Sequence, residues 1–286
     1  MEPWATDPEC RDYLHAVTAA VEERLNVISE LAVADRIRLS CQVALAADDE
    51  PFPEDPRYLR VGVYPVAANP MHWGHVLVGL SAMALLQLDK VVFIIAGTDI
   101  RKPFMVSAEN RHRLGRTVIE TFNPLIAYSP LALGTDLDGE TNFGRLLKLN
   151  AQQALEAYYI AGGDHYRRTT SEGEPDTVQK LERVVEEEAK GGNTHHDISA
   201  VFIDRDGETG QREQVSTSLN VHFLPPIPFS VSSTAVRNAL RRDDFSEDLV
   251  SLPYSCFLEI RSNGLYRDVR ERLEKSEPPA QPLPAR

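Results

Sequence analysis

Hydrophobic residues along the chain follow two different patterns, which separate an N-terminal segment from the rest. Between residues 8 and 47, apolar side chains recur at helical spacing, and Asp7-Pro8 is typical of a helix start. This pattern predicts one or two amphipathic helices. Residues 48–56 combine an acidic run with prolines at positions 51, 53 and 56, which predicts a linker or an irregular surface segment.

From residue 59 onward, short apolar runs alternate with longer amphipathic segments. The apolar runs predict strands at 59–66, 90–96, 125–128, 157–161, 198–203 and 220–224. The amphipathic segments predict helices at 74–88, 107–122, 142–154, 177–190, 233–241 and 253–262. Helices between near-continuous apolar strands indicate an α/β fold, a doubly wound parallel sheet with both faces covered, in which ligands bind beyond the carboxyl ends of the strands.

Composition agrees with a globular protein and excludes several classes. The chain has 286 residues, of which 42% are hydrophobic, and 43 acidic against 30 basic side chains give a formal net charge of −13. Collagen-like, disulfide-scaffold and wholly disordered classes are excluded. The negative charge disfavours nucleic acids and anionic membranes as partners. No apolar run approaches the ~20 residues that a membrane-spanning helix needs.

The cysteines and the N-terminal sequence bear on the cellular compartment. Cys10, Cys41 and Cys256 are widely spaced and form no CxxC pair, which argues against a disulfide framework or a thiolate metal site. His195-His196-Asp197 has no third ligand at a suitable spacing, so we expect no protein-bound metal centre. The first residues lack the basic and apolar regions of a signal peptide. We therefore expect a cytoplasmic protein.

The same patterns divide the chain into three parts. Residues 1–57 form an acidic helical extension with a proline-rich linker, and they carry 13 acidic against 5 basic side chains. Residues 58–270 form the α/β domain. Residues 271–286 form a proline-rich tail, which cannot donate a regular ladder of hydrogen bonds.

The strongest chemical signal joins the first predicted strand to the helix that follows it. This segment contains Asn69-Pro70 and then His72-Trp73-Gly74-His75, an HxGH sequence at a helix start. A helix N-terminus offers N–H groups and a positive dipole end to a phosphate, and Gly74 lets the backbone approach closely. Two imidazoles that flank this glycine can reach the same phosphate. Taken alone, His72 and His75 could equally be turn and helix-surface histidines.

This strand-turn-HxGH arrangement resembles the nucleotidylyltransferase superfamily, whose HIGH-type motif binds the triphosphate of ATP or CTP. Further segments follow in the family's order, and they resemble motifs of the nicotinate and nicotinamide mononucleotide adenylyltransferases. These segments are 88–94, 101–103, 107–111, the GxD sequence ending 159–164, the ISSTxxR-like 229–237, and 252–266, which ends in Gly264-Leu265-Tyr266. The resemblance covers about residues 59 to 268 and implies a Rossmann-like nucleotidylyltransferase fold.

The resemblance also implies a site for ATP and for an acceptor mononucleotide. The implied catalytic residues are His72, His75, Lys102 and Arg237. The implied ATP-binding residues are Asn69, His72, Gly74, His75, Gly162, Asp164, Ser232, Ser233, Thr234 and Arg237. The implied acceptor-binding residues are Tyr64, Lys102 and Arg111. Adenylyl transfer needs alignment and fixed positive charge, and Mg²⁺ is expected to accompany ATP because the triphosphate supplies most of its ligands.

Each of these segments also has a plain structural interpretation when it is taken alone. The hydroxyl run 232–234 could be an N-cap, and the turn 162–164 could simply end a strand. Lys102 and Arg111 could be solvated charges. Their joint occurrence in the family's order favours the functional interpretation.

One segment departs from the family pattern. The family has glycines and an aromatic residue between the first strand and the Asp/Asn-Pro pair, whereas this chain has Pro65-Val66-Ala67-Ala68. Proline has no N–H to donate, and valine disfavours the positive φ that glycine allows. This departure puts the identity of the acceptor in question more than the ATP chemistry.

The preferred function is therefore an adenylyltransferase of NAD biosynthesis, which joins the AMP moiety of ATP to nicotinate or nicotinamide mononucleotide and releases pyrophosphate. One alternative is adenylyl or cytidylyl transfer to another phosphorylated acceptor, such as phosphopantetheine. A second alternative is a non-catalytic nucleotide-binding sensor in which residues 1–57 act on a partner, although the retention of both histidines and Arg237 argues against it. The expected ligands are ATP and a pyridine mononucleotide. The sequence leaves open whether the chain forms a homo-oligomer.

Overall fold

The computed structural model describes most of the predicted α/β domain and part of the segment before it. The described ranges are 59–98, 105–122, 125–151, 154–166, 177–191, 196–203, 218–227, 232–242 and 251–266. Residues 8, 11–12, 15–19, 22–23 and 26 are also described, and they are helical. The predicted linker, the proline-rich tail and Lys102 lie outside the described residues.

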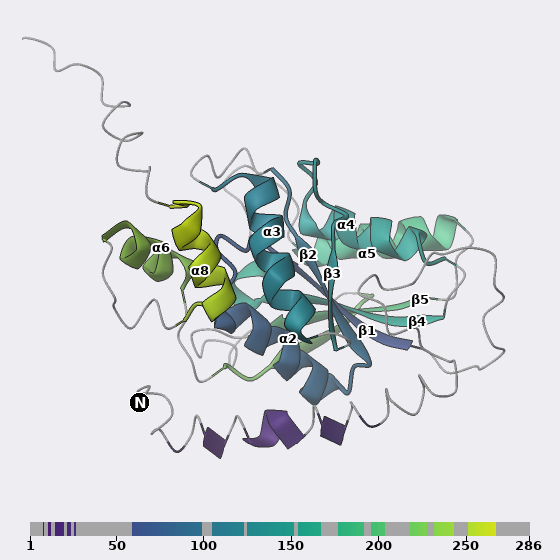
Figure 1. The fold of residues 1–286 in the computed structure, drawn as a ribbon. Helices are drawn as coiled ribbons and strands as arrows, with labels where there is room; N and C mark the ends of the chain where they lie inside the picture. The colour runs from purple at the N-terminus through teal and green to yellow at the C-terminus, as the bar shows by residue number, and fades with distance from the viewer. Residues whose placement is uncertain are drawn as a thin grey trace, which may run out of the picture.

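A six-stranded parallel sheet forms the centre of the domain (Figure 1). Its strands are β1 (Leu59–Val66), β2 (Lys90–Ile95), β3 (Ile126–Ser129), β4 (Leu155–Gly162), β5 (His196–Ile203) and β6 (Asn220–Leu224). They are ordered β3-β2-β1-β4-β5-β6, and every neighbouring pair is parallel. This order confirms the doubly wound prediction. Its direction reverses between β1 and β4, which is where such sheets open a crevice for ligands.

Helices cover both faces of this sheet, as Figure 1 shows. They are α2 (Trp73–Leu86), α3 (Ala108–Ile119), α4 (Gly139–Lys148), α5 (Thr177–Lys190), α6 (Ser233–Arg242) and α8 (Tyr254–Ser262). Buried side chains of α2, α3, α6 and α8 share one hydrophobic core with the sheet, and those of α4 and α5 share the other. Short 3-10 turns occupy Glu120–Phe122 and Gly163–His165.

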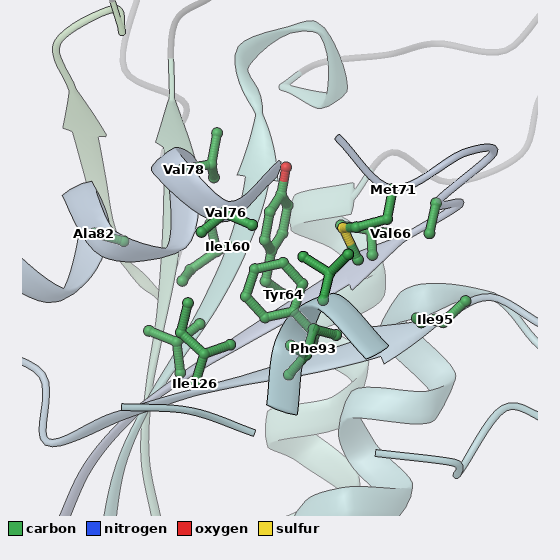
Figure 2. Packing of buried hydrophobic residues seen from close by; sticks show 14 of the residues in the cluster. Tyr64, Val66, Met71, Val76, Val78, Ala82, Phe93, Ile95, Ile126 and Ile160 are labelled. Carbon is green, nitrogen blue, oxygen red and sulfur yellow. The ribbon is translucent and has the colours of Figure 1, made fainter. Parts of the chain in front are cut away.

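Alternating residues of β1 supply the two cores. Tyr64 and Val66 belong to the core under α2 and α3, whereas Val61 and Val63 belong to the core under α4 and α5. Figure 2 shows the first of these cores, in which the Tyr64 ring packs edge-on against Phe93 with centroids 5.1 Å apart. This packing holds the end of β1 rigidly where the HxGH segment begins.

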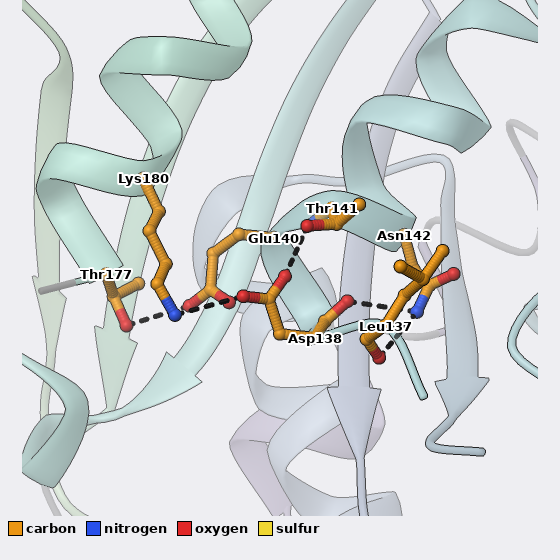
Figure 3. Close-up of polar contacts among 7 residues, drawn as sticks. All are labelled: Leu137, Asp138, Glu140, Thr141, Asn142, Thr177 and Lys180. Atoms are coloured by element: carbon orange, nitrogen blue, oxygen red, sulfur yellow. Dashed lines mark hydrogen bonds and ion pairs between the residues drawn. The ribbon is translucent and has the colours of Figure 1, made fainter. Parts of the chain in front are cut away.

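The largest difference from the predicted elements concerns α4. The apolar pattern predicted a helix at 142–154, but α4 starts at Gly139 and ends at Lys148. Asp138 caps the helix, because its carboxylate accepts a hydrogen bond of 2.8 Å from the backbone N–H of Thr141. Lys180 of α5 contacts the same carboxylate at 2.9 Å, so the cap also joins the two helices (Figure 3).

Candidate functional site

His72 and His75 meet at the first turn of α2, just beyond the carboxyl end of β1. His72 has an extended backbone and occupies the N-cap position, and its N–H donates to Nδ1 of His75 over 3.3 Å. The two rings are in contact and tilted, with centroids 3.8 Å apart and an interplanar angle of 31°. Only 5% of His72 and 8% of His75 are exposed. The structure therefore brings the two predicted histidines together as a buried pair in ring contact, with Gly74 between them in the chain.

The start of α6 lies against this pair, although it is far away in the sequence. Nε2 of His72 is 2.9 Å from Oγ of Ser233. Ser232 caps the helix locally, because its Oγ accepts from the N–H of Thr234 at 3.2 Å and its carbonyl accepts from the N–H of Val236 at 3.0 Å. The two helix N-termini thus meet at His72, and each presents N–H groups and a positive dipole end.

Arg237 adds a fixed charge to the same place. One of its terminal nitrogens donates to the carbonyl of Asn69 over 2.7 Å, and the other donates to Oγ1 of Thr234 over 2.9 Å. Burial lowers the pKa of Arg237, yet an arginine side chain keeps its charge at neutral pH. Among the described residues these bonds use two of the five N–H donors of the guanidinium.

Asn69 is held by three donors from three distant segments. Its Oδ1 accepts from the backbone N–H of Val106 at 3.3 Å and from the hydroxyl of Tyr266 at 3.0 Å, while Arg237 holds its main-chain carbonyl. Only 6% of Asn69 is exposed. Its Nδ2 makes no hydrogen bond to any described residue, which leaves the amide N–H groups for a ligand. The sequence motifs included Tyr266 but assigned it no role.

Arg111, which was predicted to bind an acceptor, lies buried among backbone carbonyls. It is 1% exposed, and its guanidinium donates to the carbonyls of Val106 (2.9 Å), Ala67 (2.8 Å), Ala96 (2.8 Å) and Gly97. These carbonyls belong to the segments that follow β1 and β2 and to the approach to α3. Arg111 is therefore neither a solvated charge nor a group exposed to a substrate, and it ties together the backbone around the site.

Tyr64, the other described candidate for acceptor binding, is also buried. It is 2% exposed and belongs to the hydrophobic core beneath the site (Figure 2). This burial places the ring within the core, and its predicted contact with an acceptor stays a prediction. The third candidate, Lys102, lies outside the described residues.

The segment that departs from the family pattern has an unusual backbone. Ala68 has φ 48°, in the left-handed region that glycine adopts without strain, and its side chain is fully buried. A residue with a Cβ atom in this conformation costs about 1 to 2 kcal/mol. The contacts of Arg111 with the carbonyl of Ala67 and of Arg237 with that of Asn69 hold the chain on both sides of Ala68.

The GxD turn lies at the end of the neighbouring strand. β4 ends at Gly162, Gly163 starts a 3-10 turn, and Asp164 follows with 57% of its side chain exposed. Because β4 is hydrogen-bonded to β1, this turn and the HxGH segment share the carboxyl edge of the sheet. The Asp164 carboxylate is accessible to a ligand there.

Two broader properties can be stated for the described part of the chain. It contains no group of three or more His, Cys, Asp or Glu residues that could hold a metal ion. None of its helices is long and apolar enough to cross a membrane.

Comparisons with known proteins bear on the fold and on the family resemblance. No family model matches the chain. A probable nicotinate-nucleotide adenylyltransferase of Citrifermentans bemidjiense is 24% identical over 224 residues, which cover 74% of this chain and 100% of the relative. A protein of the same description from Thermus thermophilus is 29% identical over 212 residues, which cover 73% of this chain and 100% of the relative. The resemblance to the nucleotidylyltransferases, and to these adenylyltransferases in particular, is thus confirmed.

A solved structure shows the same fold. The Plasmodium falciparum nicotinic acid mononucleotide adenylyltransferase complexed with NaAD aligns with a TM-score of 0.54 and 15% identity, over 73% of this chain and 98% of that protein. At this level of identity the likeness concerns the fold alone. It agrees with the Rossmann-like sheet and the helices on both of its faces.

Proposed function

We propose that this chain is an adenylyltransferase that transfers the AMP moiety of ATP to a pyridine mononucleotide and releases pyrophosphate, a step of NAD biosynthesis. The observation that carries the proposal is the buried His72–His75 pair in ring contact, to which the start of α6 brings Ser233. The names of the relatives favour nicotinate mononucleotide as the acceptor.

In this proposal the residues act by alignment and charge, because the acceptor phosphate itself attacks the α-phosphorus of ATP. His72 and His75 bind phosphate oxygens on which negative charge increases in the transition state. Arg237 binds the departing pyrophosphate, and the start of α6 contributes N–H groups and hydroxyls. Asp164 accepts hydrogen bonds from ribose hydroxyls. A ribose is a better partner than a phosphate for this exposed carboxylate, because the carboxylate and a phosphate would repel each other.

Magnesium is proposed to enter this site with ATP. In the described part of the chain, the contacts at this site come from imidazole, hydroxyl, amide and guanidinium groups, so the triphosphate and water would supply the oxygen ligands that Mg²⁺ prefers. When bound, the ion would neutralise part of the phosphate charge.

A direct assay tests the proposed reaction. Pure protein is incubated with ATP, Mg²⁺ and either nicotinate or nicotinamide mononucleotide, and both dinucleotide and pyrophosphate are measured. The proposal expects both products in equal amounts, with nicotinate mononucleotide as the better acceptor. Absence of product with both acceptors would refute it.

The variant His75→Ala separates catalysis from simple nucleotide binding. We expect kcat to fall by about 10²-fold or more, since one group that stabilises transition-state charge is lost, while ATP affinity measured by calorimetry falls by about threefold. The control is His222→Gln in β6, whose half-buried ring packs 5.8 Å from Tyr158. Equal losses of turnover and affinity in His75→Ala would favour a nucleotide sensor instead.

The segment before Asn69 supports a second candidate, transfer to a different phosphorylated acceptor. Pro65 cannot donate a backbone hydrogen bond, and the buried Ala68 stands where the related enzymes have a glycine-rich loop. A panel that includes phosphopantetheine and other phosphorylated small molecules tests this candidate. It is rejected if dinucleotide formation is the fastest reaction in the panel.

A further inference from the structure

The segment after α8 turns back sharply toward the site. Gly264 has φ 62°, its N–H donates to the carbonyl of Arg261 at 3.3 Å, and the N–H of Leu265 donates to the carbonyl of Ile260 at 3.0 Å. This pair of bonds is the Schellman motif, which ends a helix and reverses the chain through a left-handed residue. The reversal carries Tyr266 into the core, where it is 4% exposed.

Tyr266 makes one specific polar contact at the end of this turn. Its hydroxyl lies 3.0 Å from Oδ1 of Asn69, a residue 197 positions earlier in the chain. Burial strongly raises the pKa of Tyr266, so the hydroxyl stays protonated and acts as the donor. Oδ1 of Asn69 accepts a second bond from the backbone N–H of Val106, at the longer distance of 3.3 Å.

These two bonds determine which way the Asn69 amide faces. If the amide turned over, its NH₂ group would replace the oxygen and face the two N–H and O–H donors. Two donors cannot hydrogen-bond to each other, so the amide keeps this orientation. The Nδ2 group is therefore left on the opposite side of the amide, without a described partner, in the segment that leads to His72. The bond from Val106 is the longer of the two, so the tyrosine hydroxyl is the main constraint.

We infer that Tyr266 is a positioning residue for nucleotide binding, which acts through Asn69 by presenting its amide N–H groups to the bound nucleotide. The inference rests on the proposed function for the identity of the nucleotide, ATP. It goes beyond that function because it assigns Tyr266, near the C-terminal end of the α/β domain, a role in orienting a residue of the site. Tyr266 itself is buried and does not contact the ligand.

Removing a single hydroxyl group tests this inference. In Tyr266→Phe we expect the KM for ATP, and its dissociation constant from calorimetry, to rise by about five- to tenfold, the effect of one lost hydrogen bond. We expect kcat to change by less than about twofold, because the same contact is made before and during the reaction. The matched control is Tyr158→Phe in the same core, whose hydroxyl bonds instead to Arg60 and Glu156 near the amino end of the sheet. It should leave KM unchanged.

A double-mutant cycle shows whether the effect passes through Asn69. In the Asn69→Ala background, Tyr266→Phe should change the ATP dissociation constant by less than about twofold, because the amide that it orients is already gone. If Tyr266→Phe raises the ATP dissociation constant by the same factor in the Asn69→Ala background as in the wild type, the inference is overturned. A loss of kcat and thermal stability at unchanged KM would also overturn it, since that result indicates a purely structural tyrosine.

A spectroscopic measurement keeps the inference separate from the proposed function. In ¹⁵N-labelled protein without nucleotide, the side-chain amide signals of Asn69, assigned with Asn69→Ala, should shift in Tyr266→Phe and stay in place in Tyr158→Phe. If the wild type forms no dinucleotide but this signal shifts and ATP affinity falls, the proposed reaction fails and the positioning role stands. An unshifted signal refutes the positioning role whatever the enzyme's activity.

Discussion

Substitution of Arg111 by methionine gives a test of how the site is supported. Methionine fills most of the volume of the arginine stem but donates no hydrogen bonds, so four carbonyls lose their donor. A hydrogen bond from a charged group contributes about 1.5 to 3 kcal/mol, and a buried carbonyl left without a donor costs about 1 to 3 kcal/mol. The structure therefore predicts a large loss of stability.

The size of the loss follows from the surroundings of each carbonyl. Those of Ala67, Ala96 and Val106 belong to half-buried residues, so water can replace part of their bonds, whereas Gly97 is buried. Removing a buried charge also removes the cost of its desolvation. We expect a net loss of about 3 to 5 kcal/mol in the free energy of unfolding. At about 2 to 4 °C per kcal/mol, the melting temperature should fall by roughly 6 to 20 °C.

The measurement is urea unfolding followed by circular dichroism, together with acceptor KM on the folded fraction. Arg113→Met is the control, because Arg113 lies on the same helix with 48% of its side chain exposed and pairs with Glu259 at the surface. It should lose less than about 1 kcal/mol. If Arg111→Met is as stable as this control and raises only the acceptor KM, the arginine binds acceptor directly and the structural assignment is wrong.

Three further substitutions have defined outcomes. Burial lowers the pKa of His112, so the free energy of unfolding should be highest above about pH 6.5 and fall as the pH drops through the folded pKa. Urea titrations from pH 5 to 8 should show this dependence of stability on pH. The variant His112→Gln should make the dependence weaker. A Cβ atom on Gly97 would lie 2.1 and 2.2 Å from two backbone carbonyl oxygens. Gly97→Ala should therefore lower the free energy of unfolding, measured by thermal unfolding, by about 2 kcal/mol or more. The control Gly191→Ala, whose Cβ would have its nearest atoms at 3.4 Å, should be nearly neutral. Gly264→Ala has open space but φ 62°, so it should cost about 1 kcal/mol, and a neutral result would contradict the turn argument.

Local pattern predicted the strands closely, because each strand is an apolar run with breaks at both ends. β1 and β6 match their predicted bounds, and β4 begins at Leu155, earlier than predicted. The start of α4 was missed because it depends on the Asp138 cap, which precedes the apolar repeat instead of belonging to it. A polar residue that caps a helix carries no periodic signal, so hydrophobic spacing alone places the helix too late.

The contacts of the site likewise fall into some that follow from local sequence and others that depend on the whole fold. His72 and His75 are three residues apart on one helix start, so their meeting follows from local structure. The bond between Tyr266 and Asn69 depends on how the whole chain folds, and no local pattern contains it. The burial of Arg111 could not be predicted locally either, because arginines are rarely buried and the carbonyls that it contacts come from three other segments.

The net charge of −13 does not oppose a polyphosphate at this site, because the charges around it are arranged locally. α3 and α4 carry an acidic residue in the first turn, which partly neutralises the positive end of the helix, whereas α2 and α6 carry none, as is also true of α5 and α8. The N-termini of α2 and α6 are the ones that meet at His72, and Arg237 lies beside them. Interactions over a few ångströms between partly buried groups exceed those of distant, screened surface charges. The helix ends and Arg237 at His72 therefore favour the proposed binding of a polyphosphate despite the net negative charge of the chain.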